Sequence, residues 1–152
     1  MKLGVLFDDF LKSDKNYYLM KALNEHVAAE TDNVCAFVVN MSNKIIPSLF
    51  GYMGISDIAH FEDGVLIATT LNTADALNKS SSNSKKVFYL WNFEWIDKTF
   101  NFYGIQKILN NKDLRIVVRS QLQADLLKHN FNVEVDAIQE DFNLEKLNEV
   151  CT

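Results

Sequence analysis

The residues best suited to hold a ligand are the five at positions 91–95, Trp-Asn-Phe-Glu-Trp. They directly follow an apolar run at 87–90 that is typical of a buried strand. Aromatic rings beside amide and carboxylate groups suit sugar-like ligands, whose ring faces stack while their hydroxyls need hydrogen-bond partners. We therefore expect Asn92, Glu94 and Trp95 to take part in a binding site. The competing interpretation places the aromatic side chains in the core and leaves Glu94 solvated.

Polar side chains also follow three other apolar runs. They are Asp8 and Asp9, then Thr69, and finally Arg119 with Ser120. An acidic pair can accept bonds from ligand hydroxyls or hold a metal ion, although in a turn before a helix such a pair more commonly caps the helix or is solvated. Arg119 stands between a strand end and a helix start, which suits either an anion or a structural ion pair with a nearby carboxylate.

Familiar cofactor and catalytic motifs are absent from the sequence. No GxGxxG follows the first apolar run and no GxxxxGK[ST] occurs, so neither a dinucleotide cradle nor a P-loop is indicated. There is no GxSxG, and His26, His60 and His129 are far apart, which argues against a histidine-based triad. Cys35 and Cys151 form no CxxC, and we expect Cys35 to be a small buried side chain. These patterns predict no cofactor and no metal, and they leave the catalytic residues unassigned.

Short apolar runs recur along the chain and predict the strands that position these polar residues. The runs are Leu3–Phe7, Val34–Val39, Val65–Ala68, Val87–Trp91, Leu114–Val118 and Val133–Ile138. The first five are almost continuously apolar, as expected of strands buried on both faces of a parallel sheet. Helical spacing of apolar residues lies between them, near positions 18–27, 71–77, 102–109 and 122–127, and again at 144–150.

Alternating strands and helices indicate an α/β fold. We expect a Rossmann-like three-layer sandwich with a mostly parallel sheet of five to seven strands, formed by residues 1–152 as a single domain. In such sheets ligands bind beyond the carboxyl ends of the strands, so the polar residues named above should meet at one edge. In particular, Glu94, Trp95 and Arg119 should face one crevice. Glu140 and Asp141 follow the last predicted strand.

Local signals predict where the helices begin and end. Ser13 or Asp14 is available to cap the first helix. Ser120, with a glutamine three residues on, forms a capping box, and Asn130 is a plausible stop for that helix. Asn143 is expected to cap the last helix.

Two segments do not fit the alternating pattern. Lys79–Lys86 is polar throughout and predicts a solvated loop. Met41–His60 is long for a loop in a compact domain. Within and beside it, Ile55–Phe61 is expected to supply a further strand, and Ile45–Tyr52 either a short helix or a mobile flap.

The order of these features resembles the N-terminal, acceptor-side half of a GT-B type glycosyltransferase, a family built from two facing Rossmann-like domains. The resemblance covers most of the chain and lies in VFYLWNFEW (87–95), IVVRS (116–120) and VDAIQEDF (135–142). The segment AHFEDGVLIATT (59–70) is similar to short glycosyltransferase-like proteins of phage and marine bacterial type. The resemblance implies a sugar or sugar-phosphate ligand. Because the family holds its donor mainly in the other domain, it also implies that transfer needs a donor-domain partner, a second subunit or a homo-oligomer.

Two other classes of function fit parts of the sequence. Asp8 and Asp9, with Thr69 or Thr70, are typical of a phospho-receiver domain, which would need Asp57 as its phosphate acceptor. Such a domain also needs a lysine at the end of its fifth strand, and no lysine ends an apolar run here. A non-catalytic Rossmann-like interaction domain is the other alternative, because a fold alone does not specify a function.

Composition limits the partners of the protein. The 152 residues include 20 acidic and 15 basic ones, and this net charge of −5 argues against a general affinity for nucleic acid. The pair Lys85-Lys86 is the only tight basic pair and a poor candidate for a basic patch. No apolar run approaches the roughly 18 residues of a membrane span, and the N-terminus lacks the features of a signal peptide. We therefore expect a cytoplasmic protein with no membrane span.

Overall fold

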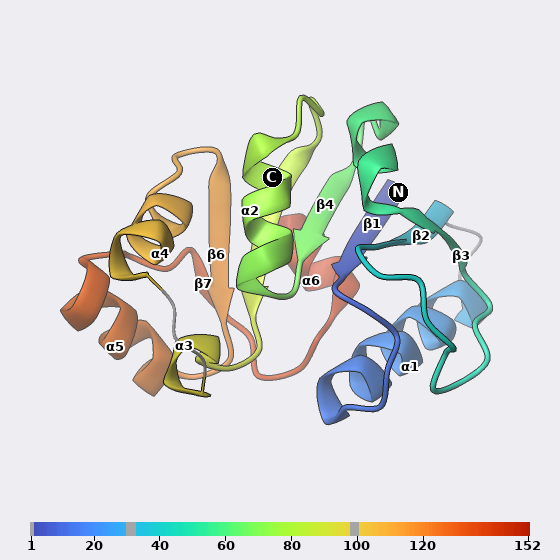
Figure 1. Ribbon diagram of the computed structural model, residues 1–152, viewed down its shortest axis with the longest axis horizontal. Coiled ribbons are helices and arrows are strands. Elements are labelled where there is room, and N and C mark those ends of the chain that lie inside the picture. The colour runs from blue at the N-terminus through green and yellow to red at the C-terminus, as the bar shows by residue number, and fades with distance from the viewer. Residues whose placement is uncertain (1, 30–32, 98–100) are drawn as a thin grey trace.

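The computed structural model describes residues 2–29, 33–97 and 101–152. Seven strands form one sheet in which every neighbouring pair is parallel, in the order β3-β2-β1-β4-β5-β6-β7 (Figure 1). The strands are β1 (Lys2–Phe7), β2 (Asn33–Val38), β3 (Gly51–Gly54), β4 (Val65–Ala68), β5 (Lys85–Leu90), β6 (Leu114–Val118) and β7 (Ala137–Ile138). The expected α/β sandwich with a parallel sheet of five to seven strands is confirmed.

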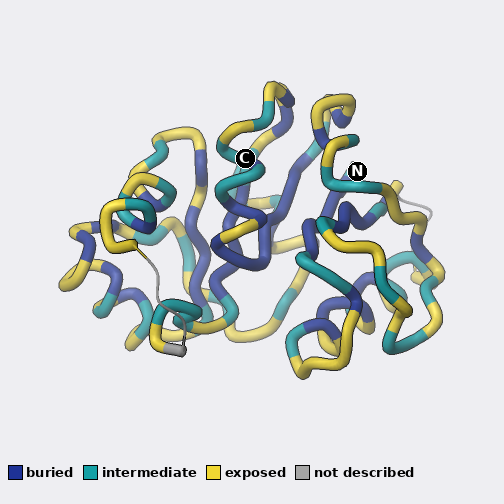
Figure 2. Tube along the Cα trace, in the orientation of Figure 1, coloured by how far each residue is buried: buried dark blue, intermediate teal, exposed yellow. Residues whose placement is uncertain are grey.

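Helices cover both faces of the sheet and make it a three-layer structure. They are α1 (Asp14–Ala29), the 3₁₀ helix η1 (Ile55–His60), α2 (Leu71–Lys79), α3 (Glu94–Asp97), α4 (Phe102–Leu109), α5 (Gln121–Phe131) and α6 (Leu144–Glu149). One apolar core lies between the sheet and η1, α2, α4 and α5, and the other lies between the sheet and α1 and α6. Strands β1, β4 and β5 are buried over most of their length (Figure 2), which explains their nearly continuous apolar sequence.

The segment between β2 and β4 differs from expectation. Ile45–Tyr52 forms no helix, and its last two residues, Gly51 and Tyr52, already belong to β3. Phe50 is buried, with its ring centroid 6.5 Å from that of Phe10. The predicted strand at Ile55–Phe61 is wrong as well, since a 3₁₀ helix occupies this place and the strand β3 precedes it. Ile55 and Ile58 are three residues apart, the 3₁₀ period, and both pack against the same core.

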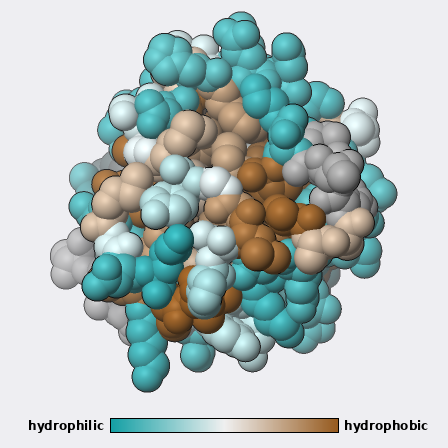
Figure 3. Space-filling view, turned by 90° about the vertical axis from the view of Figure 1, so that its right-hand side faces the viewer, coloured by the Kyte–Doolittle hydropathy of each residue, from teal (hydrophilic) through white to brown (hydrophobic). Residues whose placement is uncertain are grey.

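The sheet edge formed by β3 carries exposed apolar side chains. Tyr52 and Met53 of β3 and the preceding Leu49 are all exposed. Figure 3, which views the molecule from the side of β3, shows hydrophobic side chains gathered on this face. A mostly apolar hollow of about 460 Å³ lies here, with Asp57 and His60 of η1 in its lining.

The last strand is shorter than predicted. Val133–Ile138 was expected to be extended throughout, but β7 contains only Ala137 and Ile138. Asp136 explains the difference, because its carboxylate Oδ2 accepts the backbone N–H of Ile116 at 2.7 Å. A side chain therefore takes the place of a backbone acceptor next to β6.

Most helix ends follow their predicted caps. Ser13 Oγ accepts an N–H in the first turn of α1, and Asn143 caps α6. Ser120 caps α5, but the capping box is only half formed, since the side chain of Gln123 bonds to the N–H one residue before the cap. Helix α5 runs to Phe131 and its C-cap is Asn132, not Asn130, because Asn132 adopts the left-handed conformation (φ 54°) that closes a helix.

The polar segment Lys79–Lys86 is not a purely solvated loop. Ser82 and Ser84 are buried, and both hydroxyls donate to the carbonyl oxygen of Phe61. Lys85 and Lys86 already belong to β5. The serine side chains therefore hold this loop against the chain before β4.

Both cysteines are free thiols and partly buried. Cys35 Sγ lies 3.8 Å from the carbonyl oxygen of Leu3, and burial raises the pKa of the Cys35 thiol to about 11. Cys35 is thus less buried than the sequence predicts. Within the described ranges, no helix has the length and apolar character needed to cross a membrane.

Candidate functional site

The strand order reverses between β1 and β4, where β1 leads on one side to β2 and on the other side to β4. Open parallel sheets bind ligands beyond the carboxyl ends of the strands at such a reversal. A cleft of about 560 Å³ lies at these carboxyl ends, and we name it the switch-point cleft. Strands β1 and β4 run toward this edge in Figure 1, where their arrowheads point downward. Five of the eight predicted site residues line it: Asp8, Asp9, Thr69, Asn92 and Glu94.

The loop after β1 is held by Asp9 and Asn16. Asp9 Oδ1 accepts the N–H of Leu11 at 2.9 Å and the side-chain amide of Asn16 at 3.1 Å. The same amide nitrogen also donates to the carbonyl oxygens of Asp9 and Leu11. Asp9 therefore stabilises the turn after β1, whereas Ser13 accepts the N–H in the first turn of α1.

Asn16 is a functional candidate that the sequence did not reveal. It lines the switch-point cleft and is only 4% exposed. Its amide nitrogen is fully engaged, whereas its Oδ1 is buried and has no hydrogen-bond partner among the described residues. A buried acceptor without a donor is costly, so this oxygen favours a ligand or water that donates to it.

Asp8 presents a carboxylate from the other side of the same loop. Its Oδ1 accepts the side-chain amide of Asn72, in the first turn of α2, at 2.8 Å. A carboxylate has about four acceptor positions, so this contact leaves capacity for ligand donors. Asp8 therefore connects the loop after β1 to the first turn of α2 and remains available to a ligand.

Thr69 and Thr70 are buried, and their hydroxyls bond within the protein. Thr69 Oγ1 donates to the carbonyl oxygen of Leu6 at 2.6 Å. Thr70 caps α2 through a capping box with Thr73. These threonines hold β4 against β1 and start α2, so their contribution to the cleft is mainly one of position.

The side chain of Glu94, the first residue of α3, lies at the N-terminal end of α2. Its Oε2 accepts the N–H of Leu71 at 2.5 Å, so a carboxylate of this protein takes the place where a ligand anion would bind. The cleft is lined by four acidic residues and two lysines. The acidic residues are Asp8, Asp9, Asp14 and Glu94, and the lysines are Lys12 and Lys15. This charge favours ligands that donate hydrogen bonds over anionic ones.

Trp91 supplies the aromatic wall of the cleft. It also lines a neighbouring hollow of about 410 Å³, which we name the flanking pocket and which contains Arg119. The Arg119 guanidinium lies over the Trp91 ring, 4.0 Å from its centroid, and Tyr18 stacks on the same indole at 6.1 Å. Arg119 Nε donates to the carbonyl oxygen of Glu140, which fixes the guanidinium in this position.

Gln123 connects the ends of β5 and β6. Its Oε1 accepts the N–H of Arg119 at 2.6 Å, and its Nε2 donates to the carbonyl oxygen of Trp91 at 3.3 Å. The sequence indicated Gln123 only as part of a capping box. Its actual contacts fix the relative positions of the cation and the indole.

Trp95 and Ser120 lie outside the switch-point cleft. The Trp95 ring packs against Phe93 and Phe131, with centroids 5.0 Å and 5.4 Å away. Helix α3 begins at Glu94, and successive helical residues point about 100° apart, so Glu94 and Trp95 diverge. The expected grouping of Glu94, Trp95 and Arg119 in one crevice is therefore not formed, and the aromatic surface comes from Trp91.

Tyr89 anchors the chain after β7. Its hydroxyl donates to the carbonyl oxygens of Gln139 and Glu140 at 3.1 Å and 3.0 Å. Burial raises the pKa of Tyr89 to about 12, although the nearby Arg119 charge opposes the shift. The group therefore stays protonated and keeps donating at neutral pH.

Among the described residues, no group of three or more His, Cys, Asp and Glu side chains is arranged to hold a metal ion. Comparisons of the chain with protein-family models, curated proteins and solved structures found no match.

Proposed function

We propose that the switch-point cleft binds a neutral, hydroxyl-rich ligand of the sugar class. The observation that carries this proposal is Asn16, a residue in the lining of a cleft rich in carboxylate acceptors, whose buried Oδ1 has no partner among the described residues. Sugar hydroxyls donate to amide and carboxylate oxygens, and the Trp91 indole adds aromatic surface to the lining. The volume of about 560 Å³ lies within the range of small-molecule sites.

The proposed ligand is a sugar rather than a free phosphate. Glu94 already satisfies the N–H of Leu71, and the surrounding carboxylates repel a further anion. A sugar phosphate fits only with its phosphate in the flanking pocket beside Arg119, on the other side of Trp91. The proposal therefore ranks neutral sugars first and sugar phosphates second.

In this proposal the domain performs the acceptor role of a GT-B-like glycosyltransferase half. Its cleft holds the acceptor, and a second domain or subunit brings the donor. The parallel sheet with its reversal at β1 and β4 supports this role, because it places a binding cleft at one edge.

The phospho-receiver alternative requires its acidic residues to meet. Asp57 lies in η1 and lines the apolar hollow beside β3, whereas Asp8 and Asp9 line the switch-point cleft. The three carboxylates thus belong to separate pockets, which favours the sugar proposal. A non-catalytic interaction domain would show no saturable sugar binding, so the experiment below distinguishes it.

The test is a titration with neutral mono- and disaccharides and their phosphates, followed by tryptophan emission. The chain has two tryptophans, so the variant Trp95→Phe leaves Trp91 as the reporter in the cleft. We expect saturable emission changes that Asp8→Asn weakens about tenfold, because a charge-assisted bond to a hydroxyl is lost. Asp125→Asn is the matched control, since Asp125 also accepts one side-chain amide at 2.8 Å but lies on α5.

Two results would contradict the proposal. One is an absence of saturable binding for every sugar tested while the protein remains folded. The other is equal weakening by Asp8→Asn and Asp125→Asn, which would place the ligand outside the switch-point cleft.

A further inference from the structure

A second polar pocket lies at the opposite, amino edge of the sheet. It has a volume of about 420 Å³, and we name it the amino-edge pocket. Four cationic side chains line it, and they are Lys85, Lys86, Lys112 and Arg115. The only carboxylate in its lining is Asp113, although the chain as a whole carries a net charge of −5.

Strand register brings these cations together. Lys85 and Lys86 open β5, and Arg115 stands near the start of β6, where Lys86 pairs with Leu114 and Val87 with Arg115. Lys112 lies in the turn that leads into β6. Because neighbouring parallel strands begin at the same edge, residues about thirty positions apart share one pocket.

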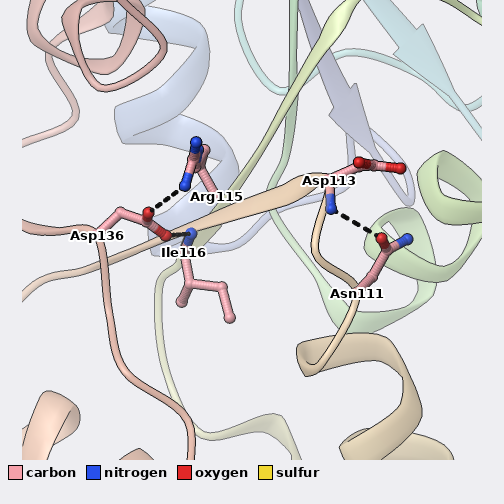
Figure 4. A network of polar contacts seen from close by, with 5 residues as sticks. All are labelled: Asn111, Asp113, Arg115, Ile116 and Asp136. Atoms are coloured by element: carbon pink, nitrogen blue, oxygen red, sulfur yellow. Dashed lines mark hydrogen bonds and ion pairs between the residues drawn. The ribbon is translucent and has the colours of Figure 1, made fainter.

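Arg115 is held in place by Asp136. Its Nη1 donates to Asp136 Oδ1 at 3.1 Å, while Oδ2 of the same carboxylate accepts the N–H of Ile116 (Figure 4). Figure 4 also shows that the carboxylate of Asp113 points away from Arg115. A guanidinium has five N–H donors, so the bond to Asp136 orients Arg115 and leaves donors for a ligand.

The lysines of the amino-edge pocket are less engaged. Lys86 Nζ donates to the carbonyl oxygen of Ser80 at 3.2 Å. The side chains of Lys85 and Lys112 have no hydrogen bond or ion pair with any residue that the structure describes, and both residues are exposed. Lys85 and Arg115 lie on the same face of the sheet, because Arg115 pairs with Val87, two residues after Lys85, whereas Lys86 points to the other face. The pocket thus combines one oriented guanidinium with two ammonium groups that lack an anionic partner among the described residues.

We propose that the amino-edge pocket binds a compact phosphorylated small molecule, such as a phosphate ester or a diphosphate. Guanidinium and ammonium groups around a hollow suit phosphate oxygens, which accept several charge-assisted hydrogen bonds. The pocket is concave and of nucleotide size, whereas nucleic acid needs a basic stripe along a face. The acidic balance of the chain also opposes an extended polyanion. This site is separate from the switch-point cleft and does not depend on the sugar proposal.

The test is calorimetric titration with inorganic pyrophosphate at low ionic strength. We expect one-to-one binding that weakens about tenfold in the double variant Lys85→Gln/Lys112→Gln, from two exposed charge contacts. The matched control is Lys107→Gln/Lys146→Gln, which removes the same charge from exposed lysines outside the pocket. Because the substituted side chains are exposed, both variants should fold, which thermal unfolding verifies.

Backbone amide shifts in NMR spectra locate the bound pyrophosphate. The largest changes are expected at positions 82–86 and 112–115. The proposal is overturned by an absence of binding, by equal weakening in the two double variants, or by shifts confined to positions 8–16 and 69–72. Tighter binding of a short single-stranded oligonucleotide than of pyrophosphate and mononucleotides would also overturn it, in favour of nucleic acid.

Discussion

The carboxylate of Glu94 accepts the backbone N–H of Leu71, so a residue that follows β5 completes the start of the helix that follows β4. This contact ties together two neighbouring loops at the carboxyl edge of the sheet. The Glu94 carboxylate also places a negative charge at the N-terminal end of α2. The selectivity proposed for the switch-point cleft, for neutral hydroxyl-rich ligands, depends on this relationship.

Removal of the Glu94 carboxylate should weaken the start of α2. We expect Glu94→Ala to lower the free energy of unfolding by about 0.5–2 kcal/mol, because a capping acceptor is lost. Glu94→Gln keeps an acceptor oxygen and should cost less. Urea denaturation of the two variants measures this difference, and an Ala variant as stable as the wild type would show that the contact contributes nothing.

The raised pKa of Tyr89 predicts that the protein loses stability at high pH. The pKa of its phenol is about 12 in the folded protein against 10.0 ordinarily, so between these values the folded state binds more protons than the unfolded state. Its contribution is therefore complete below about pH 10 and falls as pH rises toward about 12. Unfolding measured across this range should show a steeper fall for the wild type than for Tyr89→Phe. Equal slopes would contradict the assignment.

Gly64 should not tolerate a side chain. A Cβ at this position would lie 2.6 Å from the carbonyl oxygen of Lys2, which is backbone and cannot move aside easily. Gly64→Ala is expected to destabilise the protein by about 1–3 kcal/mol. Gly51 in β3 is the control, since a Cβ there meets nothing within 4 Å and Gly51→Ala should change stability by less than about 0.5 kcal/mol. Thermal unfolding of both variants checks this contrast.

The chain by itself should bind but not transfer a sugar. The proposed acceptor role requires a second domain or subunit to hold the donor. Incubation with a panel of nucleotide-sugars and simple acceptors should therefore release no nucleotide above the rate of spontaneous hydrolysis. Clear turnover by this chain alone would show that no partner is needed and would remove the GT-B-like part of the proposal.

The sequence by itself determined the alternating strands and helices, because burial on both sheet faces requires apolar runs and burial on one helix face requires a 3.6-residue period. It also located Asp8, Thr69 and Glu94 at strand ends, and parallel strands end at one edge. Their meeting in the switch-point cleft therefore followed from local pattern and topology.

Only the tertiary structure decided which neighbouring side chains face that cleft. Trp91 lines it and Trp95 does not, because the helical turn beginning at Glu94 rotates the second indole toward Phe131. Three acceptor oxygens surround the amide nitrogen of Asn16, and this orientation leaves its Oδ1 without a donor among the described residues. No sequence pattern indicates this arrangement.

The amino-edge pocket shows the same limit of the sequence. The sequence predicts no basic patch from the pair Lys85-Lys86 alone. Strand register places Arg115 near this pair, and the turn before β6 brings Lys112 into the same pocket. Residue types and spacing determine the elements, since these depend on neighbours in the chain. Which charges and acceptors share a pocket depends on contacts between residues far apart in the chain, and only the folded sheet sets these.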